Sequence, residues 1–393
     1  MFTVPLRILA INWQDLKNPL SGGAEVHLQE LLSRLAGWGH EVTLLCSGFP
    51  GGSDTDEYDG IRVFRKGSRQ TFNWTAPGAA KRLMRDERFD VVIEDINKIP
   101  IYTPRFCSVP ILAVVPHLFA TTVFHEINAV LASYIYMMEK PVPRYYRNVP
   151  FMVISESTKK DLVGRGIPSG QIRVVHCGID HQLYRTDPLQ AKTPEPSVTY
   201  VGRLKKYKSV DHMFEAAARI QDEFPSLTLT VVGAGDDDNR LRQRAVALGV
   251  ANRVRFAGFV PAERKVEILR SSWVVVCPSL KEGWGLTNIE ANACGTPVVC
   301  ADVPGLRDSA IDGKTALLYP YGDIDALADR LRRMLSDHSL RESLTIGGLE
   351  WAESFHWDEA ARETESILER VAQGETQIAA TVSAGVMEQD RAS

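Results

Sequence analysis

Short apolar runs rich in β-branched residues alternate with helix-like segments along most of the chain, and this alternation limits the possible folds more than any other feature. The first run, RILAIN, covers residues 7–12, and an amphipathic helical pattern follows over residues 24–38 and stops at Gly39. Strands that alternate with helices are typical of parallel α/β sheets, because each helix crosses back over the sheet to the next strand. The chain is therefore predicted to be an α/β protein.

The alternation occurs twice along the chain. Further strand-like runs in the first half are EVTLLC, IRVF, DVVIE and ILAVV, and those in the second half are VTYVG, LTLTVVG, VRFAG, WVVVCPS and TPVVCAD. Single cores stop growing near ~250–300 residues, whereas this chain has 393. Two doubly wound domains are therefore expected, and the segment 182–197, with three prolines and no periodicity, is predicted to link them.

These boundaries give a predicted order of parts. The first domain covers residues 1–181, the linker 182–197 and the second domain 198–350. Helical patterns continue to about residue 372, so a helix over 351–372 is expected to return to the first domain. Residues 373–393 are small and polar, which predicts a disordered tail.

Charge and apolar content exclude several classes of function. The formal net charge is -4, and residues 1–180 carry 20 basic and 18 acidic residues against 25 and 31 in the remainder. This balance lacks the basic excess of a nucleic-acid binder. The opening apolar run is too short for a signal peptide, and prolines interrupt the apolar region 109–124, so a cytoplasmic protein is expected. The six cysteines form no CxxC pair, which favours reduced thiols over disulfides or zinc.

The stretch KEGWGLTNIEANACGTPVV, residues 281–299, places glycines and two carboxylates directly after a predicted strand that ends at Ser279. Ligands of open α/β sheets bind beyond the carboxyl ends of the strands. Gly283 and Gly285 would let the backbone approach a ligand, and a helix that starts near Leu286 or Thr287 offers N–H groups to an anion. A diphosphate fits these features.

A second loop, VGRLKKYKS, supplies Arg203 and Lys208 after another predicted strand. A guanidinium fork and an ammonium suit phosphate oxygens. If both loops hold one ligand, Glu290 would accept hydrogen bonds from a vicinal diol such as ribose and Glu282 from the hydroxyls of a sugar. Two plainer interpretations stay open: Thr287 and Glu290 also have the spacing of a capping box, and the cations also suit a solvated basic loop.

Several motifs together resemble the retaining glycosyltransferases of family 4. They are the Glu-x7-Glu spacing, the VGRLKKYK loop, the strand-end PS, EANACGTPVVCADVPGLRD, SGGAEVH at 21–27 and VVHCGID at 174–180. The resemblance covers nearly the whole chain except the tail. It implies the GT-B fold, in which two doubly wound Rossmann-like domains face each other across a cleft.

The resemblance also implies an activity and a set of site residues. The second domain would hold a nucleotide-diphosphate sugar, and the first would present the acceptor, as in a hexosyltransferase. Arg203 and Lys208 would neutralise the departing diphosphate, Glu290 would bind the ribose, and Glu282 with the backbone of 283–287 would hold the sugar. The residues with implied catalytic roles are His117, Arg203, Lys208 and Glu282. Those implied to bind the donor are Gly22, Gly23, Arg203, Lys208, Phe259, Val260, Glu282, Gly283, Trp284, Gly285, Leu286, Thr287 and Glu290.

Three of these assignments depend on where the family places such residues along the chain, and not on the chemistry of the local sequence. His117, with His125 behind it, follows a strand where the family places a histidine that faces the sugar. Gly22 and Gly23 precede the first helix, where N–H groups would touch the phosphate or the acceptor, although Glu25 in the first turn also suits a plain helix start. Phe259 and Val260 lie where the family contacts the nucleobase through backbone atoms.

No metal and no other cofactor is expected. GAGDDDN at 233–239 lacks the third glycine of a dinucleotide fingerprint. Its aspartates, like DTD at 54–56, resemble a metal-binding DxD, but cations and a helix start already face the predicted diphosphate. We interpret both acidic runs as solvated turn residues.

The acceptor is expected to contact first-domain loops, including 69–78 and 117–149. It would be a small molecule, a glycan or a lipid-linked compound. Within the second loop, Arg144, Tyr145, Tyr146 and Arg147 suit an anionic surface, so a peripheral contact with the inner membrane surface is a further hypothesis. A nucleotide-sugar epimerase and a non-catalytic nucleotide- or carbohydrate-binding subunit are the alternative functions.

Overall fold

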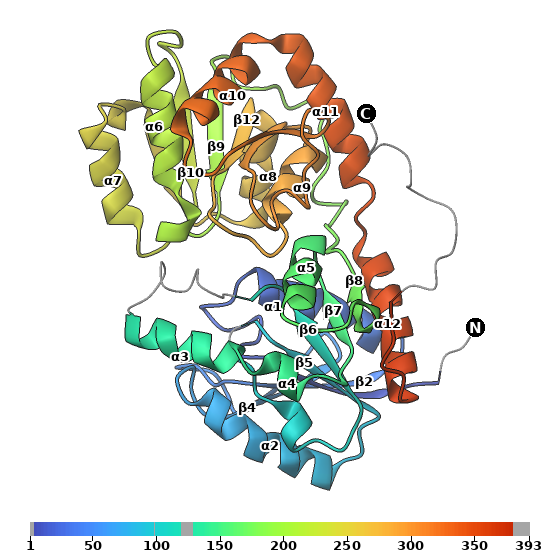
Figure 1. Cartoon of the computed structure of the whole chain (residues 1–393). Helices are drawn as coiled ribbons and strands as arrows, with labels where there is room; N and C mark the ends of the chain where they lie inside the picture. The colour runs from blue at the N-terminus through green and yellow to red at the C-terminus, as the bar shows by residue number, and fades with distance from the viewer. Residues whose placement is uncertain (1–3, 98, 119–128, 380–393) are drawn as a thin grey trace.

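Two sheets organise the chain (Figure 1), and the computed structural model describes residues 4–97, 99–118 and 129–379. The first sheet has the strand order β3-β4-β2-β1-β5-β6-β7-β8 and is parallel except for the β3–β4 pair. Its strands are β1 (Arg7–Ile11), β2 (Glu41–Cys46), β3 (Thr55–Tyr58), β4 (Ile61–Arg65), β5 (Val91–Asp95), β6 (Ile111–Val115), β7 (Phe151–Val153) and β8 (Ile172–Val174). The helices of this unit are α1 (Gly23–Gly37), α2 (Phe72–Asp86), α3 (Ala129–Glu139), α4 (Val142–Tyr145) and α5 (Glu156–Gly164).

The second sheet is parallel throughout, with the order β11-β10-β9-β12-β13-β14. Its strands are β9 (Ser197–Val201), β10 (Thr228–Val232), β11 (Val254–Gly258), β12 (Val274–Cys277), β13 (Val298–Ala301) and β14 (Ala316–Tyr319). The later helices are α6 (Val210–Ile220), α7 (Asp238–Ala247), α8 (Ala262–Ser271), α9 (Leu286–Ala293), α10 (Ile324–Ser336), α11 (His338–Ala352) and α12 (Trp357–Ala372). The prediction of two doubly wound α/β units is confirmed.

The central strands read as continuous apolar runs because helices cover both faces of each sheet. All residues of β1 except Arg7, and all residues of β5, β6, β9, β12 and β13, are buried. The β1 strand pairs in register with β2 on one side and β5 on the other, with Ile8 opposite Val42 and Val91. This arrangement aligns the carboxyl ends of the strands along one edge of the sheet.

The chain crosses between the two units at two adjacent places. Residues 177–181 leave the first sheet, and residues 355–357 return from α11 to α12, which packs against α1 in the first unit (Figure 1). The Ile179 N–H donates to the Phe355 carbonyl at 3.1 Å, and Ile179 bridges His356 in a parallel pair. A methyl group at Gly178 would overlap with the backbone of Trp357. The two crossings therefore lie in direct backbone contact.

Residues beyond α12 continue along the first unit before the described chain ends. Ile378 is 1% exposed, and its N–H donates to the Gly170 carbonyl at 3.0 Å. The predicted tail comprises residues 373–393: its first part, 373–379, is described and packs Ile378 on the first unit, and 380–393 lie outside the described residues. All six cysteines are free thiols, and all but Cys107 are buried.

The acidic runs are not simply solvated turns, which corrects that interpretation. DTD leads into β3, where Asp56 accepts hydrogen bonds from Lys17 at 2.9 Å and Arg65 at 3.2 Å. In the second run, Asp237 is 7% exposed and receives two hydrogen bonds from Arg240, at 2.6 and 2.7 Å. Both aspartates therefore accept hydrogen bonds from nearby arginine side chains. Within the described chain, no group of three or more His, Cys, Asp or Glu side chains is placed to hold a metal ion.

A buried histidine in the first unit predicts acid sensitivity. His27 of α1 is 1% exposed, neither ring nitrogen has a hydrogen-bond partner among the described residues, and burial lowers its pKa to about 4. Between pH 6.5 and 4 the unfolded chain therefore binds a proton that the folded chain does not. The stability due to a neutral His27 is complete above pH 6.5 and is lost as the pH falls, by about 2 kcal/mol at pH ~4.5.

Urea unfolding of the wild type and of His27→Leu at neutral and mildly acidic pH tests this expectation. His27→Leu should lose less free energy of unfolding on acidification than the wild type. His338→Leu is the matched control, because His338 is largely exposed on α11. An identical loss in the wild type and His27→Leu would contradict the assignment.

Candidate functional site

Loops at the carboxyl ends of the two sheets touch each other. The Lys281 ammonium, after β12, donates to the Leu118 carbonyl after β6 at 2.6 Å. The Ser157 N–H, after β7, donates to Asp308 Oδ1 after β13 at 3.2 Å. We call this contact zone, formed by the loops after β1, β6 and β7 of the first sheet and after β9, β12 and β13 of the second, the junction. Ligands of open α/β sheets bind at such strand ends.

Arg203 lies at the junction on the loop after β9, and its positive charge has no acidic partner in the described part of the chain. Its guanidinium lies against the loop after β1, because a methyl group at Gly22 would be 3.1 Å from Cζ of Arg203. Among the described residues, its side chain has no hydrogen-bond or ion-pair partner. The backbone beneath it is fixed, since the buried Tyr200 donates its hydroxyl to the Arg203 carbonyl at 3.0 Å. A rigid loop thus holds the guanidinium beside the first unit.

Lys208, on the same loop, forms an ion pair with Glu282 from the loop after β12. The side chains are only 14% and 21% exposed, and Ser279 Oγ also donates to the Glu282 carboxylate at 2.7 Å. Burial acts to lower the pKa of Lys208, but the Glu282 carboxylate outweighs it, so this pKa lies above its ordinary value. Glu282 therefore keeps Lys208 charged at the junction.

The glycine loop before α9 approaches the first unit closely. A methyl group at Gly283 would lie 3.1 Å from the Pro116 carbonyl oxygen and 3.5 Å from Nδ1 of His117. Gly285, at φ +97°, precedes α9, so the helix begins at Leu286 and its first turn includes Thr287. The first N–H groups of a helix have no partner within the helix. The α9 start therefore brings backbone donors to the same region as Lys208.

The Trp284 side chain lies within the protein between the two units. It is 3% exposed and stacks on His176 of the first unit, with ring centroids 4.4 Å apart, and it meets the Phe355 ring edge to face at 5.3 Å. Among the predicted donor-binding residues, Trp284 thus places its indole away from solvent. Only its backbone belongs to the glycine loop.

Glu290 does not form the capping box that its spacing from Thr287 would allow. Gly285 is the residue before the helix, and no side chain caps the α9 start. The Glu290 carboxylate instead accepts a hydrogen bond from Lys265 of α8 at 2.8 Å. Lys265 also lies 4.7 Å from the ring centre of Tyr184, and burial together with the nearby Glu290 raises the pKa of Tyr184. Lys265 and Tyr184 thus fix the Glu290 carboxylate.

His117 lies at the junction in its neutral form. Loss of solvent contact, and then the charge of Lys281, lower its pKa to about 4. At neutral pH the imidazole therefore offers a neutral donor or acceptor rather than a positive charge. His125 lies outside the described residues.

The two glycines before α1 differ in their surroundings. The Gly22 N–H donates to the Glu25 carboxylate at 2.7 Å, which is the arrangement of a plain helix start. Gly22 also lies against Arg203, whereas a methyl group at Gly23 would meet nothing within 4 Å. The Glu25 contact is the plain helix start that the sequence left open, whereas the approach of Gly22 to Arg203 was not predicted.

Phe259 and Val260 follow β11, at the same edge of the second sheet. The Phe259 ring is 85% exposed, and Val260 is partly buried against the core. The preceding Gly258 carbonyl accepts a hydrogen bond from the Gly233 N–H at 2.8 Å. β11 lies two strands from β9, so Phe259 is farther along the edge than Arg203.

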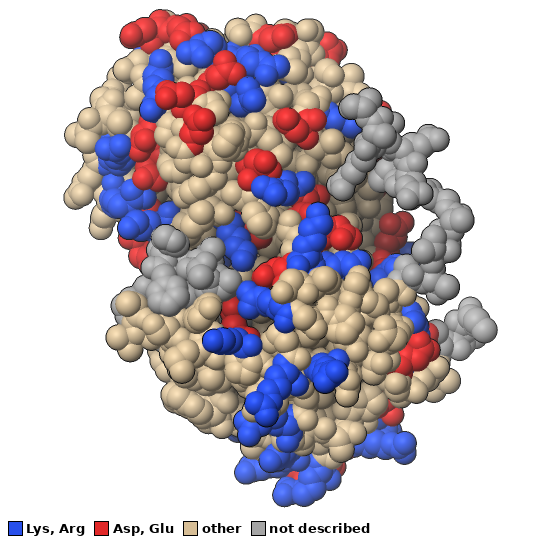
Figure 2. Space-filling model, in the orientation of Figure 1, with Lys and Arg blue, Asp and Glu red and all other residues tan. Residues whose placement is uncertain are grey.

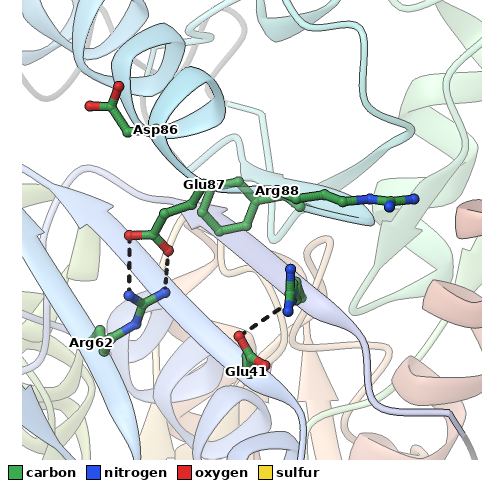
Figure 3. Close-up of a pocket in the computed structure, with 7 residues that line it drawn as sticks. Glu41, Arg62, Asp86, Glu87 and Arg88 are labelled. Atoms are coloured by element: carbon green, nitrogen blue, oxygen red, sulfur yellow. Dashed lines mark hydrogen bonds and ion pairs between the residues drawn. The ribbon is translucent and has the colours of Figure 1, made fainter.

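A hollow of about 350 Å³ lies at the opposite edge of the first sheet (Figure 3). Arg7 and Glu41 begin β1 and β2, so this edge carries the amino ends of the strands. Charge pairs occupy it, since Arg62 donates to both oxygens of Glu87, at 3.2 and 2.6 Å. This hollow is therefore separate from the junction.

The structure brings six of the fourteen predicted site residues into contact at one place. Direct contacts place six of them at the junction: Gly22, His117, Arg203, Lys208, Glu282 and Gly283. Sequence reasoning missed Lys265, Lys281 and Ser279. Lys281 belongs to the quoted motif, but its partner is a backbone carbonyl more than 160 residues away. No spacing rule would have revealed that contact.

Two family models match most of the chain. The model described as Glycosyltransferase Family 4 matches residues 21–183, and the model described as Glycosyl transferases group 1 matches residues 186–351. Among curated proteins, D-inositol 3-phosphate glycosyltransferase of Acidothermus cellulolyticus is 36% identical over 209 residues, which cover 49% of this chain and 46% of the relative. The chain thus spans about half the length of such relatives. Glycogen synthase of Mycobacterium tuberculosis is 27% identical, and the match covers 95% of this chain and 96% of that relative.

Solved structures share the fold over nearly the whole chain. Sucrose-phosphate synthase from Thermosynechococcus elongatus superposes with a TM-score of 0.81 at 23% identity, covering 94% of this chain and 100% of that one. Anabaena Alr3699/HepE in complex with UDP-glucose gives a TM-score of 0.74 at 19% identity, covering 93% and 99%. At these identities the likeness concerns the fold.

Proposed function

Since this chain belongs to the family 4 glycosyltransferases of group 1, with the GT-B fold, we propose that it is a retaining hexosyltransferase that moves a sugar from a nucleotide-diphosphate donor to an acceptor hydroxyl. One observation carries the proposal. The loop after β9 places the guanidinium of Arg203 against Gly22 and the charged ammonium of Lys208 against Glu282, where the carboxyl ends of both sheets meet.

The diphosphate would bind to Arg203, Lys208 and the start of α9. Preorganised cations at a site of developing negative charge stabilise a leaving group without reorganisation during the reaction. Glu282 supports this role, because it keeps Lys208 protonated before the donor binds. When the diphosphate arrives, Lys208 would share its three N–H donors between Glu282 and a phosphate oxygen. These fixed charges match the diphosphate without a metal ion.

The two glutamates would then bind hydroxyl groups. Lys208 and Ser279 both donate to Oε1 of Glu282, so Glu282 would accept from the donor sugar with Oε2. Glu290 would accept from the ribose, and its hydrogen bond to Lys265 supports this role by fixing the carboxylate in one orientation. Phe259 and Val260 would lie beside the nucleobase, and their backbone does not distinguish one base from another.

In the proposed reaction the acceptor hydroxyl attacks the anomeric carbon on the face that the diphosphate leaves. A phosphate oxygen takes the hydroxyl proton, the bond to the diphosphate breaks, and the configuration is retained without an enzymic nucleophile. Neutral His117 would hydrogen-bond the donor sugar, and N–H groups at Gly22 and Gly23 would contact the phosphate or the acceptor. The acceptor would be a small molecule, a glycan or a lipid-linked compound bound by the first unit. Because the structurally similar Alr3699/HepE forms a complex with UDP-glucose, a UDP-hexose is the first donor to assay.

Product analysis tests the proposal. The purified protein is incubated with nucleotide-diphosphate hexoses and a panel of acceptors, and the new glycoside is examined by NMR. We expect nucleoside diphosphate release that depends on acceptor, with the donor's anomeric configuration in the product. An epimerised nucleotide-sugar formed without acceptor would favour an epimerase. Donor binding with neither transfer nor hydrolysis would favour a non-catalytic subunit, and an inverted product would contradict the proposed mechanism.

A further inference from the structure

Helices α2, α3 and α4 lie on one outward face of the first unit (Figure 1). The short turn η1 (Thr103–Arg105) belongs to the same surface through the contacts described next. Asn73 of α2 donates to the Tyr134 hydroxyl of α3 at 2.7 Å. Tyr102, just before η1, packs edge to face on Tyr145 of α4, with ring centroids 5.3 Å apart. These contacts make the elements neighbours, and we call their exposed surface the α2–α4 face.

Large apolar side chains stand out from this face. Val130 is 84% exposed, Trp74 69% and Met137 68%, while Tyr136 and Tyr145 are 39% and 38% exposed. Solvent-exposed tryptophan, methionine and valine on neighbouring helices form an apolar patch, and such patches on soluble proteins mark interaction surfaces.

Unpaired cations lie among these apolar groups. Six exposed basic residues lie in these elements or within two residues of their ends: Lys81, Arg82, Arg105, Lys140, Arg144 and Arg147. None of them has an acidic partner among the described residues. The nearby acids do not neutralise these cations. Glu139 is buried, with 1% exposure, and Asp86 pairs with Arg85 at 2.9 Å. Figure 2 shows Lys and Arg spread over the first unit on this side, with few Asp or Glu between them.

We propose that the α2–α4 face docks onto a bilayer that contains anionic phospholipids. Tryptophan and tyrosine favour the boundary between headgroups and acyl chains, and Lys and Arg near the surface are attracted to anionic lipid. Protein interfaces, by contrast, have an apolar core that is depleted in charged residues and a polar rim around it. Here cations and apolar groups alternate: the Arg105 and Arg144 guanidiniums lie 5.3 and 5.9 Å from the Tyr145 ring centre.

This surface differs in one residue from the cluster expected from the sequence. Tyr146 is fully buried and donates its hydroxyl to Glu94 at 2.7 Å, so it cannot reach a membrane, which corrects that part of the hypothesis. Among the described helices, none has the length and apolar content needed to cross a bilayer. The inference concerns a peripheral contact and does not depend on the donor site.

Vesicle co-sedimentation tests the docking surface with the full chain. We expect the wild type to bind vesicles of phosphatidylcholine mixed with phosphatidylglycerol, to bind pure phosphatidylcholine at least about tenfold more weakly, and to be released by salt at about 0.5 M. Arg144→Glu/Arg147→Glu should weaken binding at least about tenfold by charge repulsion. Trp74→Ser/Met137→Ser should weaken it about tenfold by loss of apolar insertion.

The matched control is Arg255→Glu/Arg333→Glu, which makes the same change of net charge on the second unit. Both residues are exposed, and neither forms an ion pair among the described residues. This control should bind vesicles like the wild type, and unfolding midpoints should show that every variant folds. The proposal is overturned if the wild type ignores anionic vesicles, if the control loses binding as strongly as Arg144→Glu/Arg147→Glu, or if an acidic protein or duplex DNA binds the face more tightly than the vesicles do.

Discussion

Replacement of Arg203 by alanine is expected to lower kcat/KM for sugar transfer by about 100- to 1000-fold, the usual effect of removing one preorganised charge from a site of developing charge. The fold should tolerate the change. The guanidinium has no acidic partner among the described residues, so its loss leaves no carboxylate unpaired. Steady-state kinetics with an identified donor, together with the unfolding midpoint, measure both effects.

Two further variants make this prediction specific. Lys206→Ala removes an exposed cation from the same loop and should leave kcat/KM near the wild-type value. Arg203→Lys retains the charge without the planar fork and should recover only part of the activity. Near-wild-type turnover of Arg203→Ala would remove Arg203 from the proposed diphosphate site.

Gly233→Ala is expected to destabilise the second unit by about 2–5 kcal/mol. Gly233 has φ +131°, and a methyl group there would overlap with the carbonyl oxygen of Gly202, the residue before Arg203. Overpacking costs about 1–3 kcal/mol, and the left-handed backbone adds about 1–2 kcal/mol for a residue with a Cβ. Urea unfolding measures the loss.

Gly249→Ala separates the cost of the steric overlap from the cost of the left-handed backbone. Gly249 has φ +72°, but a methyl group there would meet nothing within 4 Å. It should therefore cost only the backbone part, about 1–2 kcal/mol. Equal losses in Gly233→Ala and Gly249→Ala would show that the contact with Gly202 is not tight.

The sequence predicted the central strands well because burial on both faces leaves a strong local signal. RILAI and SVTYV are rich in apolar and β-branched residues, and every residue in them except Arg7 is buried. The strand β3 was missed because TDEY is polar and lies at the edge of the sheet, where only its pairing with β4 defines it. The three-residue strands β7 and β8 are too short for a period to be read.

The site was less predictable because its contacts join distant parts of the chain. The motif predicted which residues would approach a ligand, but it did not indicate that Glu282 pairs with Lys208 or that Glu290 pairs with Lys265. Each pair depends on how helices and loops of neighbouring strands are placed. The GAG sequence is a further example of a contact between distant residues. Gly233 and Gly235 pack closely against the backbone of residues 202 and 204, and no local pattern reveals that role.

The central claim is that the junction binds a nucleoside diphosphate through Arg203 and Lys208. Thermal unfolding of the wild type and Arg203→Ala with a panel of nucleoside diphosphates and their sugars tests it most directly. We predict that at least one of these ligands, at ~100 times its dissociation constant, adds about 2.7 kcal/mol to the stability of the wild type. At the same concentration Arg203→Ala should gain much less. If no nucleoside diphosphate stabilises the wild type, or if Arg203→Ala is stabilised equally, the claim is contradicted.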